Sequence, residues 1–117
     1  MPRYLYLIAG DESMLDSATP EDWDKMLQAH NDWQKSVEAA GATMTHGDAL
    51  HPSGTATTIR HGADGAPTVT DGPFAETKEA IGGYYILDCP DFDVALGLAK
   101  SLPGEVVELR PVMDLPG

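Results

Sequence analysis

The chain has 117 residues, of which 19 are acidic and 7 are basic, and its formal net charge is −12. This length suits a single domain over residues 1–117, and a core of that size needs no metal or disulfide. The acidic charge disfavours DNA, RNA and anionic membranes as direct partners. Cys89 is the one cysteine, and no apolar run is long enough to cross a bilayer or to act as a signal segment. We therefore expect a cytoplasmic protein without an internal disulfide.

The first two predicted elements are a strand and a long helix. Residues 4–8 are apolar at every position, which is typical of a strand covered on both faces. Thr19 can cap a helix, Pro20 suits the first helical position, and Gly41 suits a helix end, which together predict a helix over 20–40. One face of this helix is predicted to be buried, and it comprises Trp23, Met26, Leu27, His30, Trp33 and Val37.

The rest of the chain alternates strand patterns with turn signals. The predicted strands span 42–49, 55–60, 67–70, 83–88 and 106–113. Residues 62–65 have the glycines of a hairpin turn between the second and third of these strands. Asp91 can cap a second helix, which Pro103 and Gly104 end.

The element order is β-α-β-β-(β)-β-α-β, which predicts an α+β fold of the ferredoxin-like split βαβ type with an added hairpin. Both helices are long enough to cover one face of the sheet. The other face then needs a cover, and residues 4–8 and 84–87 are apolar on both sides. A second copy of the chain is the simplest cover, so we expect a homodimer through the open sheet face, a dimeric α/β barrel-type assembly.

One stretch carries a family resemblance. Its matching residues are Asp71, Gly72, Pro73, Phe74, Glu76, Thr77, Lys78, Glu79, Gly82 and Gly83. With flanking pieces that extend over almost the whole chain, this pattern resembles the DGPF-domain branch of the YCII-related family of small bacterial proteins. The resemblance implies a ferredoxin-like α+β unit that pairs into a dimer. It implies little about activity, because most members have no assigned function.

The candidate catalytic residues are His30 and Asp71, and each has two interpretations. His30 is either a core histidine satisfied by one hydrogen bond or an acid–base group that lines a pocket. The carboxylate of Asp71 either shapes its own turn or orients the imidazole of His30. The resemblance favours the functional interpretation, because a histidine on the first helix paired with an aspartate looks like the family's candidate acid–base pair.

The candidate ligand-binding residues are Arg60, Phe74, Glu76, Lys78, Glu79 and Tyr85. The three charged loop residues are either a solvated turn or the rim of a pocket, with Lys78 receiving an anionic group. Arg60 pairs with an acid or binds a carboxylate, and the two aromatic residues serve as core, interface or ligand platform. The sequence has no phosphate-binding loop, dinucleotide fingerprint or zinc spacing, so we expect no cofactor and no metal.

Three classes of function follow from these residues. The first is a cofactor-free small-molecule enzyme, an isomerase or lyase, that uses His30 with Asp71. The alternative is a non-catalytic module that binds a small ligand or regulates, and the resemblance links such modules to transcription through alternative sigma factors. A scaffold for protein assembly is the third hypothesis. An enzyme predicts His30 in a solvent-connected site, whereas a scaffold predicts His30 sealed in the core.

Overall fold

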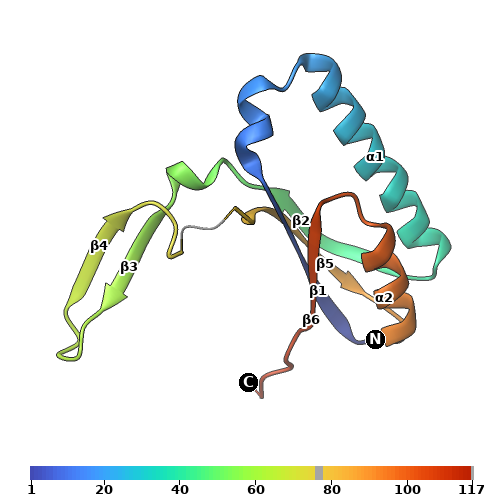
Figure 1. The fold of residues 1–117 in the computed structure, drawn as a ribbon. Coiled ribbons are helices and arrows are strands. Elements are labelled where there is room, and N and C mark those ends of the chain that lie inside the picture. The colour runs from blue at the N-terminus through green and yellow to red at the C-terminus, as the bar shows by residue number, and fades with distance from the viewer. Residues whose placement is uncertain (76–77, 117) are drawn as a thin grey trace.

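The computed structural model of the chain, which describes residues 1–75 and 78–116, has a four-stranded antiparallel sheet with two helices on one face (Figure 1). The strand order is β2–β5–β1–β6. The strands of this sheet are β1 (Arg3–Gly10), β2 (Thr43–Ala49), β5 (Ala80–Asp88) and β6 (Val106–Pro111). The helices are α1 (Pro20–Ala39) and α2 (Phe92–Ser101). This arrangement confirms the predicted ferredoxin-like α+β fold.

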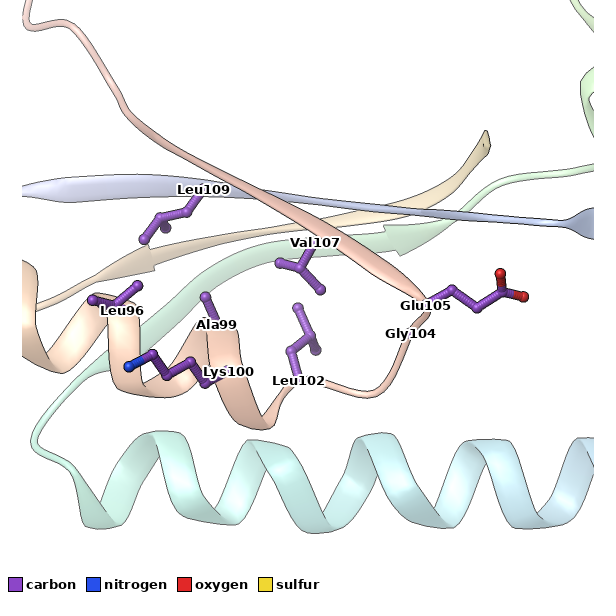
Figure 2. A pocket seen from close by; sticks show the side chains of 8 residues that line it. All are labelled: Leu96, Ala99, Lys100, Leu102, Gly104, Glu105, Val107 and Leu109. Atoms are coloured by element: carbon purple, nitrogen blue, oxygen red, sulfur yellow. The ribbon is translucent and has the colours of Figure 1, made fainter. Parts of the chain in front are cut away.

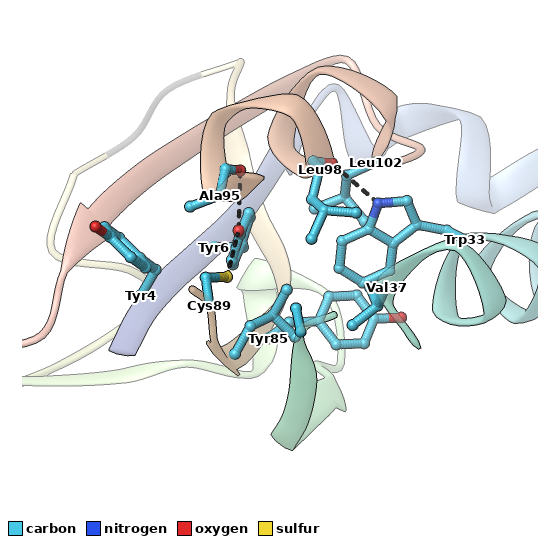
Figure 3. Packing of buried hydrophobic residues seen from close by; sticks show 11 residues of the cluster. Tyr4, Tyr6, Trp33, Val37, Tyr85, Cys89, Ala95, Leu98 and Leu102 are labelled. Carbon is cyan, nitrogen blue, oxygen red and sulfur yellow. Dashed lines mark hydrogen bonds between the residues drawn. The ribbon is translucent and has the colours of Figure 1, made fainter. Parts of the chain in front are cut away.

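The core lies between the sheet and the helices (Figure 3). Its main residues are Tyr4, Tyr6, Trp33, Val37, Tyr85, Leu87, Cys89, Ala95 and Leu98. The polar ends of the buried aromatic side chains have partners. The hydroxyl of Tyr6 donates to the carbonyl oxygen of Ala95 at 2.9 Å, and the indole nitrogen of Trp33 donates to the carbonyl oxygen of Leu98 at 2.9 Å. The first bond joins α2 to strand β1, and the second joins α1 to α2, so both buried polar groups are satisfied.

Helix α1 begins and ends as the sequence predicts. Thr19 and Asp22 form a reciprocal capping box, and Gly41 follows the helix with φ +80°. The predicted burial of its apolar face is wrong for the first half. That half rises away from the sheet (Figure 1), and Trp23, Met26 and Leu27 are exposed. Burial is confined to the second half, because only there does the sheet lie beneath the helix.

Strands β3 (Thr57–His61) and β4 (Pro67–Asp71) pair only with each other, and we call this hairpin, residues 57–71, the arm. The arm extends away from the sheet (Figure 1), and the chain measures 49 × 46 × 18 Å. Its radius of gyration is 16.5 Å, whereas a compact chain of this length has about 13 Å. The added hairpin of the prediction is therefore present, but it packs on no other strand of the described chain.

Among the residues that the structure describes, no helix lies on the second face of the sheet, and we call it the open face. Strand β1 contributes Leu5 and Leu7 to it, and strand β5 contributes Tyr84 and Ile86. These side chains are half-buried, and they are the alternating partners of the residues that point into the core. Two short 3₁₀ helices, η1 (Glu12–Ser17) and η2 (Ser53–Thr55), form where only loops were predicted.

Candidate functional site

His30 lies on α1 at the border between core and solvent, and its side-chain partner is Tyr85. The Nδ1 atom of His30 is 2.9 Å from the hydroxyl oxygen of Tyr85, and the two rings are 5.9 Å apart. Trp33, one turn further along α1, packs its ring 4.8 Å from the ring of Tyr85. The three rings form a continuous row from the half-buried imidazole into the core, so the position of His30 is set by β5.

The place of the Tyr85 ring depends on Gly47, which lies opposite it in β2. A Cβ atom on Gly47 would lie 2.5 Å from a ring carbon of Tyr85, closer than van der Waals contact permits. The absence of a side chain at Gly47 therefore lets the ring lie over β2 and present its hydroxyl to α1. The sequence analysis did not single out Gly47, and a glycine inside a strand pattern was the available signal.

Partial burial of the imidazole lowers the pKa of His30, so the ring is neutral at pH 7. A neutral imidazole has one donor nitrogen and one acceptor nitrogen. If the Tyr85 hydroxyl donates to Nδ1, then Nε2 carries the proton and is a hydrogen-bond donor. If Nδ1 donates to the Tyr85 oxygen, then Nε2 has a free lone pair and acts as a base. The direction of this bond therefore decides whether Nε2 is able to accept a proton.

Asp71, the predicted partner of His30, lies on the arm and away from α1. It is the last residue of β4, it is exposed, and its cross-strand neighbour is Thr57. The arm that carries it extends away from the sheet and from α1 (Figure 1). The structure of a single chain therefore brings His30 to Tyr85 and does not bring it to Asp71.

The loop after Asp71 is shaped by backbone bonds and by Arg60. Gly72 has φ +102° and donates its amide to the carbonyl oxygen of Ala56 at 2.7 Å. The guanidinium of Arg60 donates to the carbonyl oxygen of Phe74 at 2.5 Å. Arg60, predicted to bind a ligand, thus holds the loop in the described chain. Its side chain reaches along the arm to do so.

A cavity of about 770 Å³ lies where the arm meets the sheet, and we call it the hollow. Its lining includes Leu50, Ser53, Thr57, Phe74, Glu79 and Ile81. Two predicted ligand-binding residues, Phe74 and Glu79, therefore share one cavity. Lys78 is exposed beside it, and Glu76 lies outside the described residues. No residue of α1 lines the hollow, so it is not the predicted pocket between helix and loop.

The root of the arm is tied to the rest of the chain by Glu12. Its carboxylate accepts from the amide of Ser53 at 3.0 Å and from the hydroxyl of the same residue. These bonds lower the pKa of Glu12. They join η1 to η2 across 41 residues of sequence, a pairing that no local pattern could have indicated.

A second cavity, of about 330 Å³, lies between α2 and β6 (Figure 2). Leu96, Leu109 and the stem of Lys100 line it, and none of the predicted site residues does. Within residues 1–75 and 78–116, no three His, Cys, Asp or Glu side chains gather as metal ligands would. In the same ranges, neither helix combines the length and the apolar composition needed to cross a membrane.

The fold and site define a small ferredoxin-like α+β domain with a half-buried histidine–tyrosine pair and a projecting arm. The family model of the YCII-related domain matches residues 3–115, and the chain belongs to this family. A similar protein is an uncharacterized protein of Rhizobium meliloti (strain 1021), 36% identical over 99 residues. That match covers 85% of this chain and 78% of the relative.

Proposed function

We propose that this YCII-related protein is a cofactor-free small-molecule enzyme in which His30 transfers protons. The hydrogen bond between His30 and Tyr85 is the observation that carries the proposal. It orients the imidazole in a half-buried site where burial keeps the ring neutral at pH 7. A histidine whose pKa lies at or below the working pH is suited to general acid–base catalysis.

The reaction class that fits this pair is proton transfer at carbon, as in an isomerase or lyase. Nε2 of His30 would take a proton from an activated C–H bond and return it to another atom of the same substrate. Tyr85 is then a positioning residue, because its hydroxyl holds Nδ1. Lys78 would supply positive charge for an anionic substrate group, and both Lys78 and Asp71 reach His30 only if a second copy brings them there.

Deuterium exchange tests this function without knowledge of the substrate. We would incubate the protein in D₂O with small keto and enol acids and follow loss of C–H signals by NMR. Exchange that His30→Ala abolishes and His46→Ala retains is the expected result, since His46 is an exposed histidine on β2. Equal exchange rates for wild type and His30→Ala would refute the proposal.

Pairing of two copies through the open face is part of the proposal. The apolar side chains of Leu5, Leu7 and Ile86 have no cover within the described chain, and a second sheet laid on them would bury them. The hydroxyl of Tyr84 already donates to Asp48 at 2.8 Å, so the polar end of this tyrosine is satisfied before pairing. Sedimentation velocity of Leu7→Asp, which we expect to be monomeric, checks this point.

The hollow favours a second candidate function, a non-catalytic ligand-binding or regulatory module. Its volume is within the usual range for small-ligand pockets, and its lining is largely apolar. Among the described residues the lining has no lysine or arginine, so it suits a neutral ligand better than an anionic one. Saturation-transfer NMR with a fragment library, on wild type and Phe74→Ala, tests this alternative. Fragments whose signal is lost in Phe74→Ala would support it.

A further inference from the structure

The arm is an incomplete structure within one chain. Its two strands pair with each other alone, and an isolated two-stranded hairpin is marginally stable in water. Ile59 and Val69 lie directly opposite each other in the pairing register, so their side chains share one face. That pair is 52% and 63% exposed respectively. The arm therefore presents an uncovered apolar ridge, which we define as Ile59 and Val69.

The opposite face of the arm is polar. Thr58 lies opposite Thr70, and Arg60 lies opposite Thr68. The ridge shares its face with Thr57, Asp71, His61 and Pro67, so it is an apolar centre on that face, whereas the four residues of the opposite face are Thr or Arg. The ridge is thus the side on which a covering surface belongs.

The same chain carries a matching surface at the hollow. Leu50, Phe74 and Ile81 line it, and all three are exposed, Phe74 at 71%. Ile81 lies opposite Ala9 in the sheet, on the side where Leu7 also points. The hollow is therefore continuous with the open face, the surface through which we propose that two copies pair.

A chain cannot fill its own hollow with its own ridge. Ile59 is two residues beyond Thr57, which lines the hollow, so the ridge begins about 7 Å further out along the arm. The strands would have to fold back on themselves to bring the two together. A two-fold axis removes this conflict, because each arm meets the hollow of the other copy and the contact closes after two chains.

From these observations we infer that the arms of two copies clasp each other, with the ridge of each copy seated in the hollow of the other. This inference rests on the proposed pairing through the open face. Under this inference the hollow binds the ridge of the other copy and not a small molecule. Each chain has a net charge of −12, so the two copies repel. We therefore expect the dimer to tighten as salt screens that repulsion.

Sedimentation velocity over a range of protein concentrations tests the clasp. Ile59→Asp places a charge on the ridge, and Thr68→Asp places the same charge on the polar face of the same arm. Two ridges are affected per dimer, so we expect Ile59→Asp to raise the dimer dissociation constant at least about 100-fold. Thr68→Asp should change it by less than about threefold. Equal dissociation constants for the two variants would overturn the clasp.

The outcomes separate this inference from the proposed pairing. If Ile59→Asp remains a dimer while Leu7→Asp is monomeric, then the open-face pairing stands and the clasp is wrong. If wild type is monomeric even at about 100 µM protein and high salt, then both the open-face pairing and the clasp are wrong. If an excess of a small ligand competes with pairing and occupies the hollow, then the hollow serves a ligand and the clasp is overturned.

A cross-linking measurement covers the case in which Ile59→Asp fails to fold. Leu50→Cys and Val69→Cys are placed on separate chains, which are mixed and oxidised. Cys89 is fully buried and does not compete. We expect a Leu50→Cys/Val69→Cys heterodimer band on non-reducing gels. The control pairs Leu50→Cys with Thr68→Cys, on the polar face, and should give a much weaker band. Equal bands for both pairs would refute the clasp.

Discussion

Replacement of Tyr85 by phenylalanine examines the link between His30 and the core. Tyr85→Phe keeps the ring that packs on Trp33 and removes only the hydroxyl that lies 2.9 Å from Nδ1 of His30. A hydrogen bond between two neutral groups contributes about 1 kcal/mol to stability. For a domain of this size, such a loss lowers the melting temperature by about 4 °C.

The pKa of His30 gives the sharper measurement. If the Tyr85 hydroxyl donates to Nδ1, it stabilises the neutral ring, and its removal raises the pKa of His30. If Nδ1 donates to the Tyr85 oxygen, the bond also stabilises the charged ring, and its removal lowers the pKa. In both cases the change is measured from the wild-type pKa of His30, which partial burial lowers. The direction of change thus identifies which nitrogen of His30 bears the proton in the resting protein.

The assay is an NMR titration of the His30 ring in wild type, Tyr85→Phe and Asp71→Asn. Because the arm holds Asp71 away from α1 in one chain, we expect Asp71→Asn to leave the pKa of His30 unchanged in a monomeric sample. An unchanged pKa and an unchanged melting temperature in Tyr85→Phe would show that the His30–Tyr85 bond does not exist in solution.

Three further predictions concern the same surroundings. Gly47→Ala should destabilise the fold by about 1–3 kcal/mol in urea unfolding, because its Cβ meets the Tyr85 ring at 2.5 Å; Gly54→Ala, with open space around it, is the control. The pKa of His30 is lowered in the folded state, so near pH 6.5 the unfolded chain binds more protons than the folded chain. The free energy of unfolding should therefore fall as the pH drops from 6.5 toward the folded-state pKa of His30. A flat profile in this window, or the same slope in His30→Gln, would contradict this. Glu12→Gln should speed hydrogen exchange at the Ser53 amide, because that amide loses its carboxylate acceptor. In wild type, protection of the same amide should weaken as the pH falls from about 4.5 through the lowered pKa of Glu12. Unchanged exchange would show that this carboxylate does not hold the root of the arm.

Local patterns account for the parts of the fold that depend on neighbours in sequence. Thr19 and Gly41 marked the ends of α1, and apolar residues marked β1 and β5, because caps and alternation act over a few residues. The burial of α1 was only half predicted. Periodicity indicates which face of a helix is apolar, but whether a sheet extends beneath Trp23 depends on strand lengths elsewhere in the chain.

The site depended on tertiary register, which the sequence does not display. His30 and Tyr85 are 55 residues apart, and they meet because β5 pairs with β2 in the register that places Tyr85 over Gly47. The prediction identified both residues, but its functional interpretation took Asp71 as the partner of His30 because the family resemblance implied such a pair. No local sequence pattern indicates that the arm extends away from α1, so the separation of Asp71 from His30 could not be predicted.

The two tryptophans differ in a way that makes the chain its own optical probe. Trp33 is 4% exposed and packs against Tyr85, whereas Trp23 is 42% exposed on the free half of the same helix. A soluble quencher such as iodide will therefore reach the indole of Trp23 and spare that of Trp33. The fluorescence that survives quenching reports on the ring row beside His30, so protonation of the imidazole can be followed by emission in unlabelled protein.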